Sequence, residues 1–425
     1  MEKNRVVILG GGISGLTAAY AHLPTHDVLL LEKSSTCGGV MRSFTKEGFF
    51  FESGPRTFRT NHSPHLLQLV QELGLTPEIM ASSSQSTKRY ILGGKKLQQV
   101  PSLSLMWVFL QAMCREWRAP TLKGDESIYT FISRRLGPTI ANRLFDPLTL
   151  GIFGCDARKI SVQSAFPQLK KWESIHGSIL KGFLHSLGKK KKRAKLPFAA
   201  PLFSFHQGTS ALIDALEKRL RGDIHLNEEV MAIDKSKNLL IKTTQDEYLA
   251  DKVISALPPR TLAHLLVDVA PETADLLFSI PMTSLTIVHI GYKQSLLSHR
   301  GFGYLVPTSE KERIMGVVFD SEIFPSHNQK GQTRLTVMLH GNCKERAEAD
   351  ARDALYRHLQ IAELPDCVHV AEAWLPIMEV GHAEKMSAIT NSLSRELPQL
   401  HLVGNYLGHP AVEHCIARAK KMALI

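Results

Sequence analysis

The sequence predicts a mixed α/β fold with α+β character and several domains, and three observations lead to that prediction. A short apolar run at residues 5–9 is followed at once by a glycine-rich loop and a helix-type pattern. Residues 101–187 have helical periodicity, and segments between 285 and 340 are rich in β-branched residues. A chain of 425 residues also exceeds one ordinary hydrophobic core, which favours two or three domains.

Composition and charge narrow the classes of partner. A hydrophobic content of 44% with 21% charged residues is typical of a folded globular protein. The 51 lysines and arginines against 40 acidic residues give a net charge of +11, which suggests an anionic partner. Such a partner could be a nucleic acid, an acidic lipid or a carboxylate-bearing substrate, and the net charge does not choose among them. The six cysteines form no C-x-x-C pair, so we expect reduced thiols and no metal site.

The N-terminal residues "MEKNRVVILGGG" bear on localisation. Glycine interrupts the apolar run directly, so the segment lacks the hydrophobic stretch of a signal peptide. No window reaches the ~20 apolar residues that a transmembrane helix needs. We expect a cytoplasmic protein, either free or bound peripherally to the inner face of the cell membrane.

The N-terminal elements form a βαβ unit of the Rossmann type. Residues 5–9 are predicted to be a buried strand, 10–15 a turn, 16–23 a helix and 27–33 a second strand. The turn "GGGISG" fits G-x-G-x-x-G, whose glycines allow a pyrophosphate to approach the helix N-terminus. Glu32 follows at the end of the second strand, where a carboxylate can bind ribose hydroxyls. The predicted contacts of this region are Gly10, Gly11, Gly12, Ile13, Ser14, Gly15, Glu32 and Lys33.

A second glycine pair favours FAD over NAD. The ribose carboxylate already argues against the 2′-phosphate of NADP. Gly38 and Gly39 come shortly after Glu32, with Arg42 behind them. A plain NAD domain has no need of this loop, whereas Gly39 and Arg42 can line the diphosphate and the flavin edge of FAD. A simple exposed turn is the alternative.

The remaining elements suggest a discontinuous nucleotide domain. We expect a helix within 205–220, a helix after residue 410, and strands at 228–233, 238–244, 251–259, 285–292, 334–341 and 400–403. The predicted division gives an FAD-binding domain of residues 1–60, 205–260 and 385–425. Residues 61–100 and 261–384 would form the substrate-binding domain, and 101–204 a mainly helical, membrane-facing insertion.

Four segments together carry a resemblance to a known family. They are "VVILGGGISGLTAAY", "LLLEKSSTCGGVMRS", "FFFESGPRTFR" and "LVGNYLGHPAVEHCIARAKKMA". The chain resembles the protoporphyrinogen oxidase family of the amine oxidase superfamily, and "GPR" is the most particular of these signatures. The resemblance implies non-covalent FAD and oxidation of a porphyrinogen to a porphyrin in haem biosynthesis. Six electrons and six protons would leave the macrocycle in three rounds, and O2 or another electron acceptor would reoxidise the flavin. With O2 the product would be H2O2.

The resemblance also implies further site residues. It places Arg42 near the flavin diphosphate, a flavin-proximal loop at Gly54 to Thr57, and the backbone of Val230 near the adenine. A C-terminal helix would begin with Pro410 in its first turn and direct its dipole at the flavin, where negative charge develops on reduction. This chain departs from the family at His414, where an acid is usual, and in "GNYLGHPAV". The implied contacts are Gly54, Pro55, Arg56, Thr57, Val230, Gly404, Asn405, Pro410, Ala411 and Val412.

Arg56 and Arg59 flank the turn of "FESGPRTFR" with different expected roles. Glu52 ends a strand, Gly54 and Pro55 turn the chain, and Arg56 then faces the cofactor. A half-buried arginine needs an anionic partner. The flavin edge, a substrate propionate and a nearby carboxylate such as Glu52 are the alternatives. Arg59 is expected at the surface, and the chemistry itself belongs to the flavin, with Arg56 as the candidate catalytic side chain.

A basic run supplies the candidate membrane contact. Its residues show no recognition-helix pattern, so nucleic acid is not expected. A solvated loop is the alternative to binding of acidic phospholipid beside the apolar helical region. A homodimer is also left open. The run consists of Lys189, Lys190, Lys191, Lys192 and Arg193.

The function has alternatives at two levels. Within the family, coproporphyrinogen III is the alternative to protoporphyrinogen IX, and a pocket with added arginines would favour it because it has two more propionates. Outside the family, the second alternative is another oxidase or desaturase of the superfamily, acting on amines or carotenoids. Amine oxidases usually have an aromatic cage of Trp and Tyr near the flavin, and Tyr406 alone matches it weakly. A non-catalytic flavin- or NAD-binding protein at a membrane is the third reading.

Overall fold

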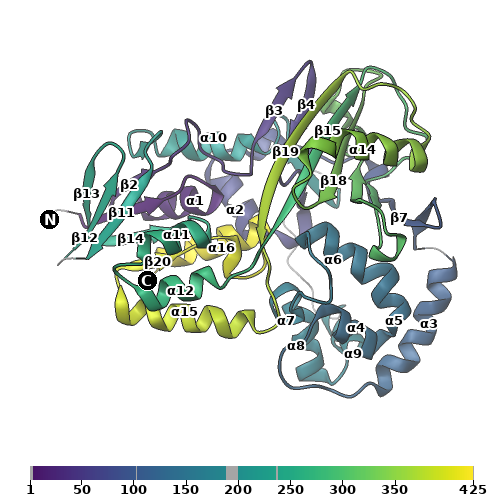
Figure 1. Ribbon diagram of the computed structural model, residues 1–425, viewed down its shortest axis with the longest axis horizontal. Helices are drawn as coiled ribbons and strands as arrows, with labels where there is room; N and C mark the ends of the chain where they lie inside the picture. The colour runs from purple at the N-terminus through teal and green to yellow at the C-terminus, as the bar shows by residue number, and fades with distance from the viewer. Residues whose placement is uncertain (1–2, 102, 188–199, 236–237, 425) are drawn as a thin grey trace.

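A computed structural model describes residues 3–101, 103–187, 200–235 and 238–424, and it confirms the mixed α/β class. Figure 1 shows a region rich in α/β layers, a large twisted sheet beside it, and a group of helices below that sheet. The basic run Lys189 to Arg193 lies outside the described residues.

The first layer is a five-stranded parallel sheet in the order β10-β2-β1-β14-β20. It gathers strands from the two ends and the middle of the chain. Their bounds are β1 Arg5–Leu9, β2 Asp27–Leu31, β10 Ile224–His225, β14 Lys252–Ser255 and β20 Leu400–Leu402.

Alternating residues of β1 supply two cores on opposite faces of this sheet. Val6 and Ile8 pack against one set of helices, while Val7 and Leu9 pack against the other side. The first set is α1 Ile13–His22, α2 Pro64–Glu72, α10 Ser210–Arg219 and α16 Val412–Met422. The second side holds α11 Pro259–Leu266, α12 Pro271–Phe278, α15 His382–Glu396, β11 Val230–Lys235, β12 Leu239–Thr243 and β13 Glu247–Ala250.

The second layer is a seven-stranded sheet in the order β19-β15-β18-β17-β16-β7-β8. Its pairs are antiparallel except for β16 with β7, which are parallel. One face packs on α14 Lys344–Leu359 (Figure 1). The strands are β7 Arg89–Gly93, β8 Lys96–Val100, β15 Met282–Tyr292, β16 Gly303–Leu305, β17 Ile314–Val318, β18 Thr333–His340 and β19 Cys367–Pro376.

Helices dominate residues 103–187, as the periodicity predicts. They share a core of their own around Phe131 and Ile132. The π-helix Ala141–Phe145 connects two of them. Their bounds are α3 Leu103–Arg118, α4 Ile128–Leu136, α5 Pro138–Ile140, α6 Asp146–Phe153, α7 Val162–Ala165, α8 Pro167–His176 and α9 Ile179–Leu187.

Two small sheets and one short helix lie where these regions meet. A hairpin pairs β3 Ser43–Lys46 with β4 Phe49–Glu52. The second small sheet joins β5 Phe58–Arg59, β9 Leu202–Phe205 and β6 Ile79–Ala81. The short helix α13 Asp320–Ile323 follows β17. Arg59 is exposed, as expected.

Several predicted boundaries are wrong by a few residues. The helix after the glycine loop begins at Ile13, because Gly12 already has the extended conformation of an N-cap residue. Glu32 lies one residue beyond β2 and does not end it. Strand β13 was not predicted, and the strand predicted at 251–259 ends at Ser255 because Pro258 cannot donate to a ladder. Among the described residues, no helix is long and apolar enough to cross a membrane.

Candidate active site

The loop between β1 and α1 forms the expected dinucleotide turn. The Gly10 amide donates to the Leu31 carbonyl over 2.8 Å, so the turn lies at the carboxyl ends of β1 and β2. A Cβ atom on Gly15 would collide with the Gly10 carbonyl, whereas a Cβ atom on Gly12 would have no described atom within 4 Å. The open space before the N-terminus of α1 therefore fits a pyrophosphate.

Glu32 holds this loop in place through backbone amides. Its carboxylate accepts from the Gly11 amide at 2.7 Å and from the Ser34 amide at 2.9 Å. Each carboxylate oxygen keeps a second lone pair, so ribose hydroxyls can still donate to Glu32. Lys33 is exposed, and Ser14 is buried in the first turn of α1.

The second glycine pair lies directly beside the first loop. Gly38 pairs with Gly12 in a parallel bridge, and its amide donates to the Gly11 carbonyl at 2.8 Å. Arg42 donates to the Thr36 carbonyl at 2.6 Å, while its Nε atom is buried and has no partner among the described residues. A buried donor without a partner is costly, so this atom suits a diphosphate oxygen. The geometry fits FAD.

The turn at Gly54 to Thr57 packs against the second glycine loop. A Cβ atom on Gly54 would collide with the carbonyl of Val40, which immediately follows Gly39. The turn residues then reach a cavity of about 640 Å³. Three predicted segments, at residues 10–15, 38–42 and 54–57, thus meet at the carboxyl ends of the parallel strands, where α/β sheets commonly bind ligands.

The guanidinium of Arg56 pairs with a carboxylate that the sequence did not indicate. Its Nη1 atom donates to Oδ1 of Asp320 at 2.9 Å, and the two side chains are 13% and 10% exposed. Thr336 donates to the other oxygen of Asp320 at 2.7 Å. Of the three expected partners the nearby carboxylate is therefore the correct class, but the residue is Asp320 and not Glu52.

Glu52 is instead bound to the segment before α10. Its oxygens accept from the Thr209 amide and hydroxyl at 2.9 and 2.7 Å, and from the Ser43 hydroxyl at 2.8 Å. Burial raises the pKa of Glu52 to about 7, although these hydrogen bonds and the charge of Arg56 act to lower it. Glu52 thereby ties the β3–β4 hairpin to the start of α10.

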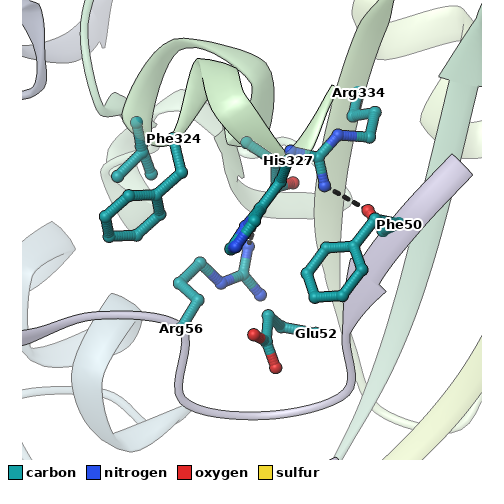
Figure 2. A pocket seen from close by; sticks show the side chains of 8 residues that line it. Phe50, Glu52, Arg56, Phe324, His327 and Arg334 are labelled. Atoms are coloured by element: carbon teal, nitrogen blue, oxygen red, sulfur yellow. Dashed lines mark hydrogen bonds and ion pairs between the residues drawn. The ribbon is translucent and has the colours of Figure 1, made fainter. Parts of the chain in front are cut away.

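Glu52, Arg56, Asp320 and Arg334 form the cavity cluster, shown in part in Figure 2. They line a second cavity of about 10 Å³, which is about the space that one water needs. Arg334 is 3% exposed and donates to the Phe50 carbonyl and to Asn328. Burial lowers the pKa of Arg334 to about 10, against the charges of Asp320 and Glu52, so it remains a cation at neutral pH.

The C-terminal helix begins later than predicted. Pro410 precedes α16, which starts at Val412 with Ala411 as its N-cap residue, so the placement of Pro410 in the first turn is wrong. The Ala411 carbonyl is the first to accept helical bonds, from His414 and Cys415, and the Ala411 amide donates to His409 instead. Helix α16 packs on α1, the helix that follows the dinucleotide loop.

The other predicted residues lie on surrounding elements. Val230 begins β11 and is half-buried on the far side of the parallel sheet. Gly404 follows β20, and Asn405 begins the 3-10 helix Asn405–Leu407. Tyr406 is 1% exposed in the core, so it does not face a cavity as a cage residue would. Within the described ranges, no group of three or more His, Cys, Asp or Glu side chains could hold a metal ion.

The 640 Å³ cavity combines apolar walls with two arginines, Arg56 and Arg89. The helical insertion contributes four positions on one side, and the seven-stranded sheet forms the other. Arg89 begins β7, and its guanidinium lies 3.9 Å from the centre of the Phe302 ring. The apolar wall includes Leu144, Leu148, Gly151, Ile152, Tyr90, Ile91, Val100, Phe302, Gly303, Tyr304, Leu305, Val317, Val318 and Met338.

Arg89 forms no ion pair with a carboxylate among the described residues. It donates to the Ser86 carbonyl at 2.8 Å. Although Arg89 as a whole is exposed, desolvation of its guanidinium and then the charge of Arg59 lower its pKa to about 10, so it is still a cation at neutral pH. Sequence reasoning missed Arg89, since residues 89–93 carry only the signal of a short strand. Residues 285–340, where the sequence predicted candidates for the substrate pocket, supply part of the wall of the 640 Å³ cavity.

Known proteins resemble this chain in family, sequence and fold. The family model "Flavin containing amine oxidoreductase" matches residues 13–371. A protoporphyrinogen oxidase of Homo sapiens is 32% identical, covering 99% of this chain and 97% of the relative. A coproporphyrinogen III oxidase of Staphylococcus aureus is 25% identical, covering 98% of both chains. A solved protein of Exiguobacterium sp. 255-15 shares the fold, with a TM-score of 0.84 and 22% identity over 100% of this chain and 98% of its own.

Proposed function

This chain belongs to the flavin-containing amine oxidoreductases and, within them, to the protoporphyrinogen oxidase family, and from that premise we propose a specific reaction. It oxidises protoporphyrinogen IX to protoporphyrin IX in haem biosynthesis. Six electrons and six protons pass to three O2 molecules, which become three H2O2. The observation that carries this proposal is the 640 Å³ cavity, which has apolar walls, two arginines and a border formed by Gly54 to Thr57.

The cavity suits a large apolar macrocycle with carboxylates on one side. Its volume lies within the roughly 300–1,000 Å³ of small-molecule sites. Leu144 and Leu148 of the insertion and Leu305 and Met338 of the sheet offer apolar surface to the macrocycle. Arg89, which has no carboxylate partner among the described residues, is available for a propionate.

The number of free cations favours protoporphyrinogen over coproporphyrinogen. Protoporphyrinogen has two propionates, and coproporphyrinogen has four. Of the two arginines in the wall, Arg56 is already paired with Asp320, which leaves Arg89. Two further carboxylates against an apolar wall would be desolvated without a partner, which is unfavourable.

FAD, when bound, supplies the acceptor for the hydrogen removed from the substrate. The protein's own residues bind and orient it. The open N-terminus of α1 at Gly12 and the Nε atom of Arg42 would both bind the diphosphate of FAD, and Glu32 would bind the ribose. The N-terminus of α16 at Ala411 and Val412 stabilises negative charge at the flavin, and the apolar walls keep water from the reacting ring.

The test supplies each porphyrinogen separately to the purified protein. Protoporphyrinogen IX and coproporphyrinogen III are prepared anaerobically, air is admitted, and porphyrin fluorescence is followed together with H2O2. We expect a flavin-dependent rise that is faster with protoporphyrinogen. A faster rise with coproporphyrinogen would identify coproporphyrinogen III as the substrate instead. No rise with either compound would refute porphyrinogen oxidation.

We further propose that the helical insertion binds the surface of an anionic membrane. Helix α3 exposes apolar side chains at helical spacing, and α9, which packs beside it, exposes others. The Nζ atom of Lys181 lies 4.7 Å from the centre of the Trp117 ring, and Arg118 follows Trp117 in the sequence. Cations beside an apolar face suit acidic phospholipid. The exposed residues are Trp107, Leu110, Met113, Trp117, Phe183, Leu184 and Leu187.

Co-sedimentation with vesicles tests this surface. The variant Trp107→Ser with Trp117→Ser should lose recovery on phosphatidylglycerol vesicles. Trp374→Ser is the matched control, because Trp374 is 55% exposed and belongs to β19 rather than to α3 or α9. A Lys189–Lys192→Ser variant tests the basic run. Equal recovery of all variants would contradict membrane binding.

A further inference from the structure

Arg56 lies between the two cavities. It lines both the 640 Å³ cavity and the 10 Å³ cavity beside it. Its guanidinium is directed to the small cavity, where Asp320 accepts from Nη1 at 2.9 Å (Figure 2 shows Arg56 with Glu52, His327 and Arg334). The charge of Arg56 is therefore neutralised on the side away from the large cavity.

Glu52, the other carboxylate of the cavity cluster, does not take the place of Asp320 as the partner of Arg56. Both oxygens of Glu52 are already bound by Thr209 and Ser43. Asp320 itself is fixed by Thr336, which donates from β18 to its second oxygen. Among the described residues, Asp320 forms the only ion pair of Arg56.

We propose that Asp320 is a specificity-determining residue, which neutralises Arg56 at the wall of the substrate cavity and so leaves Arg89 as the one wall arginine without a carboxylate partner among the described residues. This inference rests on the proposed function. A porphyrinogen with four carboxylates then meets one cation and an apolar wall, and its additional carboxylates lose hydration without gaining a partner. The cavity thus discriminates against the four-carboxylate porphyrinogen because Asp320 neutralises the charge of Arg56.

Removal of the Asp320 charge should therefore relax this discrimination. In Asp320→Asn the guanidinium of Arg56 loses its charged partner and becomes a second free cation on the wall of the large cavity. We expect the ratio of affinities for coproporphyrin III and protoporphyrin IX to shift toward coproporphyrin by about tenfold, the effect of one hydrogen bond to a charged group. The same shift should occur in the ratio of kcat/KM for the two porphyrinogens.

The binding experiment uses the FAD-loaded full chain and quenching of porphyrin fluorescence. Asp320→Ser is made beside Asp320→Asn, so that loss of the charge does not depend on one substitution. Asp320→Asn combined with Arg56→Gln should return the wild-type ratio, because the freed cation is gone. Glu322→Gln is the matched control, since Glu322 is on the same helix and pairs with the exposed Arg300.

Each outcome decides the proposal. A tenfold shift that the double variant reverses supports it. A ratio within twofold of wild type in both single variants contradicts it, and loss of FAD from both would assign Asp320 to cofactor binding instead. If wild type oxidises neither porphyrinogen but the binding ratio still shifts, the proposed function fails while the role of Asp320 stands.

Discussion

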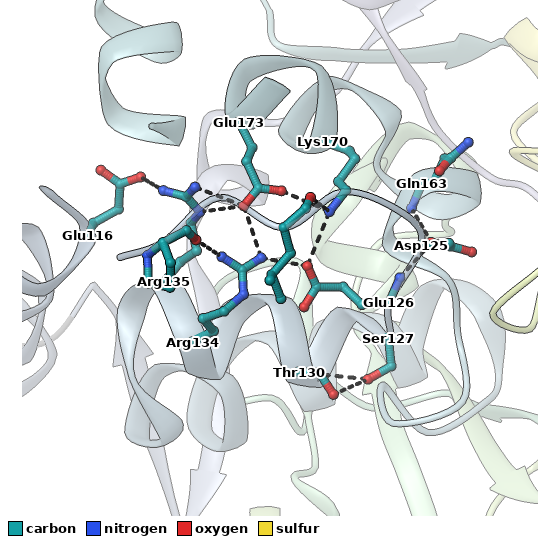
Figure 3. Close-up of polar contacts among 12 residues, drawn as sticks. Glu116, Asp125, Glu126, Ser127, Thr130, Arg134, Arg135, Gln163, Lys170 and Glu173 are labelled. Atoms are coloured by element: carbon teal, nitrogen blue, oxygen red, sulfur yellow. Dashed lines mark hydrogen bonds and ion pairs between the residues drawn. The ribbon is translucent and has the colours of Figure 1, made fainter. Parts of the chain in front are cut away.

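Two buried groups of charges differ in whether their charges are paired. Figure 3 shows the first, the insertion network, in which three cations meet three carboxylates. Arg135 is fully buried and donates to Glu116 at 2.9 Å and to Glu173 at 2.8 and 3.0 Å. Its members are Glu116, Glu126, Arg134, Arg135, Lys170 and Glu173.

The second group, the cavity cluster, is incompletely paired. Arg56 and Asp320 form an ion pair, but Arg334 is bound by a carbonyl and an amide oxygen, and Glu52 by hydroxyls and an amide. Arg89, in the wall of the neighbouring cavity, donates to a backbone carbonyl and has no carboxylate partner among the residues described. Every charge of the insertion network has an oppositely charged partner, whereas Glu52 and Arg334 have no ion pair among the described residues, and such groups can respond to a ligand or to pH. The difference separates a structural from a functional use of buried charge.

The largest expected effect comes from opening the closed network. Arg135→Met leaves Glu116 and Glu173 buried with less compensation, so the free energy of unfolding should fall by about 3–5 kcal/mol. Denaturant unfolding measures this. Arg395→Met is the control, since Arg395 and Glu272 are 66% and 57% exposed and their pair should contribute about 1 kcal/mol or less. Equal losses in both variants would contradict the comparison.

Much of the fold could be predicted from local pattern. The apolar β-branched run "VVIL" and the glycine loop were enough to predict the βαβ unit, and helical periodicity was enough to predict the helices of residues 103–187. The order of the second sheet could not be predicted, because β7 pairs in parallel with β16, more than two hundred residues away. That pairing depends on tertiary packing, which leaves no mark on either short strand.

The cofactor loops could likewise be identified from sequence, but their partners could not. Gly15 and Gly38 have local reasons that a glycine pattern reveals, a close backbone contact for Gly15 and a positive φ for Gly38. Asp320 and Arg89 have none, because each matters only through an element distant in sequence. The domain boundaries and the individual cofactor contacts stay predictions.

The next effect concerns the cavity cluster and pH. The pKa of Glu52 is about 7 in the folded protein against 4.5 for the ordinary side chain. Between these values the folded chain holds a proton that the unfolded chain has released. The free energy of unfolding should therefore fall as the pH rises from about 4.5 to about 7, by about 3 kcal/mol from this group.

Glu52→Gln removes that pH dependence while keeping the shape. The amide can still accept from the Thr209 amide and donate to the hydroxyls of Ser43 and Thr209. We expect the stability difference, wild type minus variant, to decline between pH 5 and 7.5, as measured by denaturant unfolding at each pH. Parallel curves for the two proteins would contradict a raised pKa. Glu47→Gln, on the turn of the same hairpin, is the control.

A smaller effect is expected at the free cation of the cavity wall. Arg89→Gln should raise KM for protoporphyrinogen about 10- to 100-fold, which corresponds to about 1.5–3 kcal/mol for a hydrogen bond to a charged group. Stability and flavin content should not change, because Arg89 neutralises no carboxylate among the described residues. Steady-state kinetics and visible absorption measure these. Lys96→Gln, exposed on the adjacent strand β8, should leave KM unchanged.

The smallest effect returns to the insertion network, at its partly exposed rim. Lys170 is 12% exposed and donates to Glu173 at 2.8 Å and to Glu126 at 3.2 Å. Burial would raise the pKa of Glu173, but hydrogen bonds from Lys170, Arg135 and Arg134 lower it to about 2.

Lys170→Met leaves two of those three donors in place, and water can reach the vacated site. The free energy of unfolding should therefore fall by about 1 kcal/mol, several-fold less than for Arg135→Met. Denaturant unfolding of both variants at pH 7 compares the rim with the centre. If Lys170→Met cost as much as Arg135→Met, burial would not determine the cost of losing one cation. The contrast between a closed and an open group would then depend on the number of ion pairs alone.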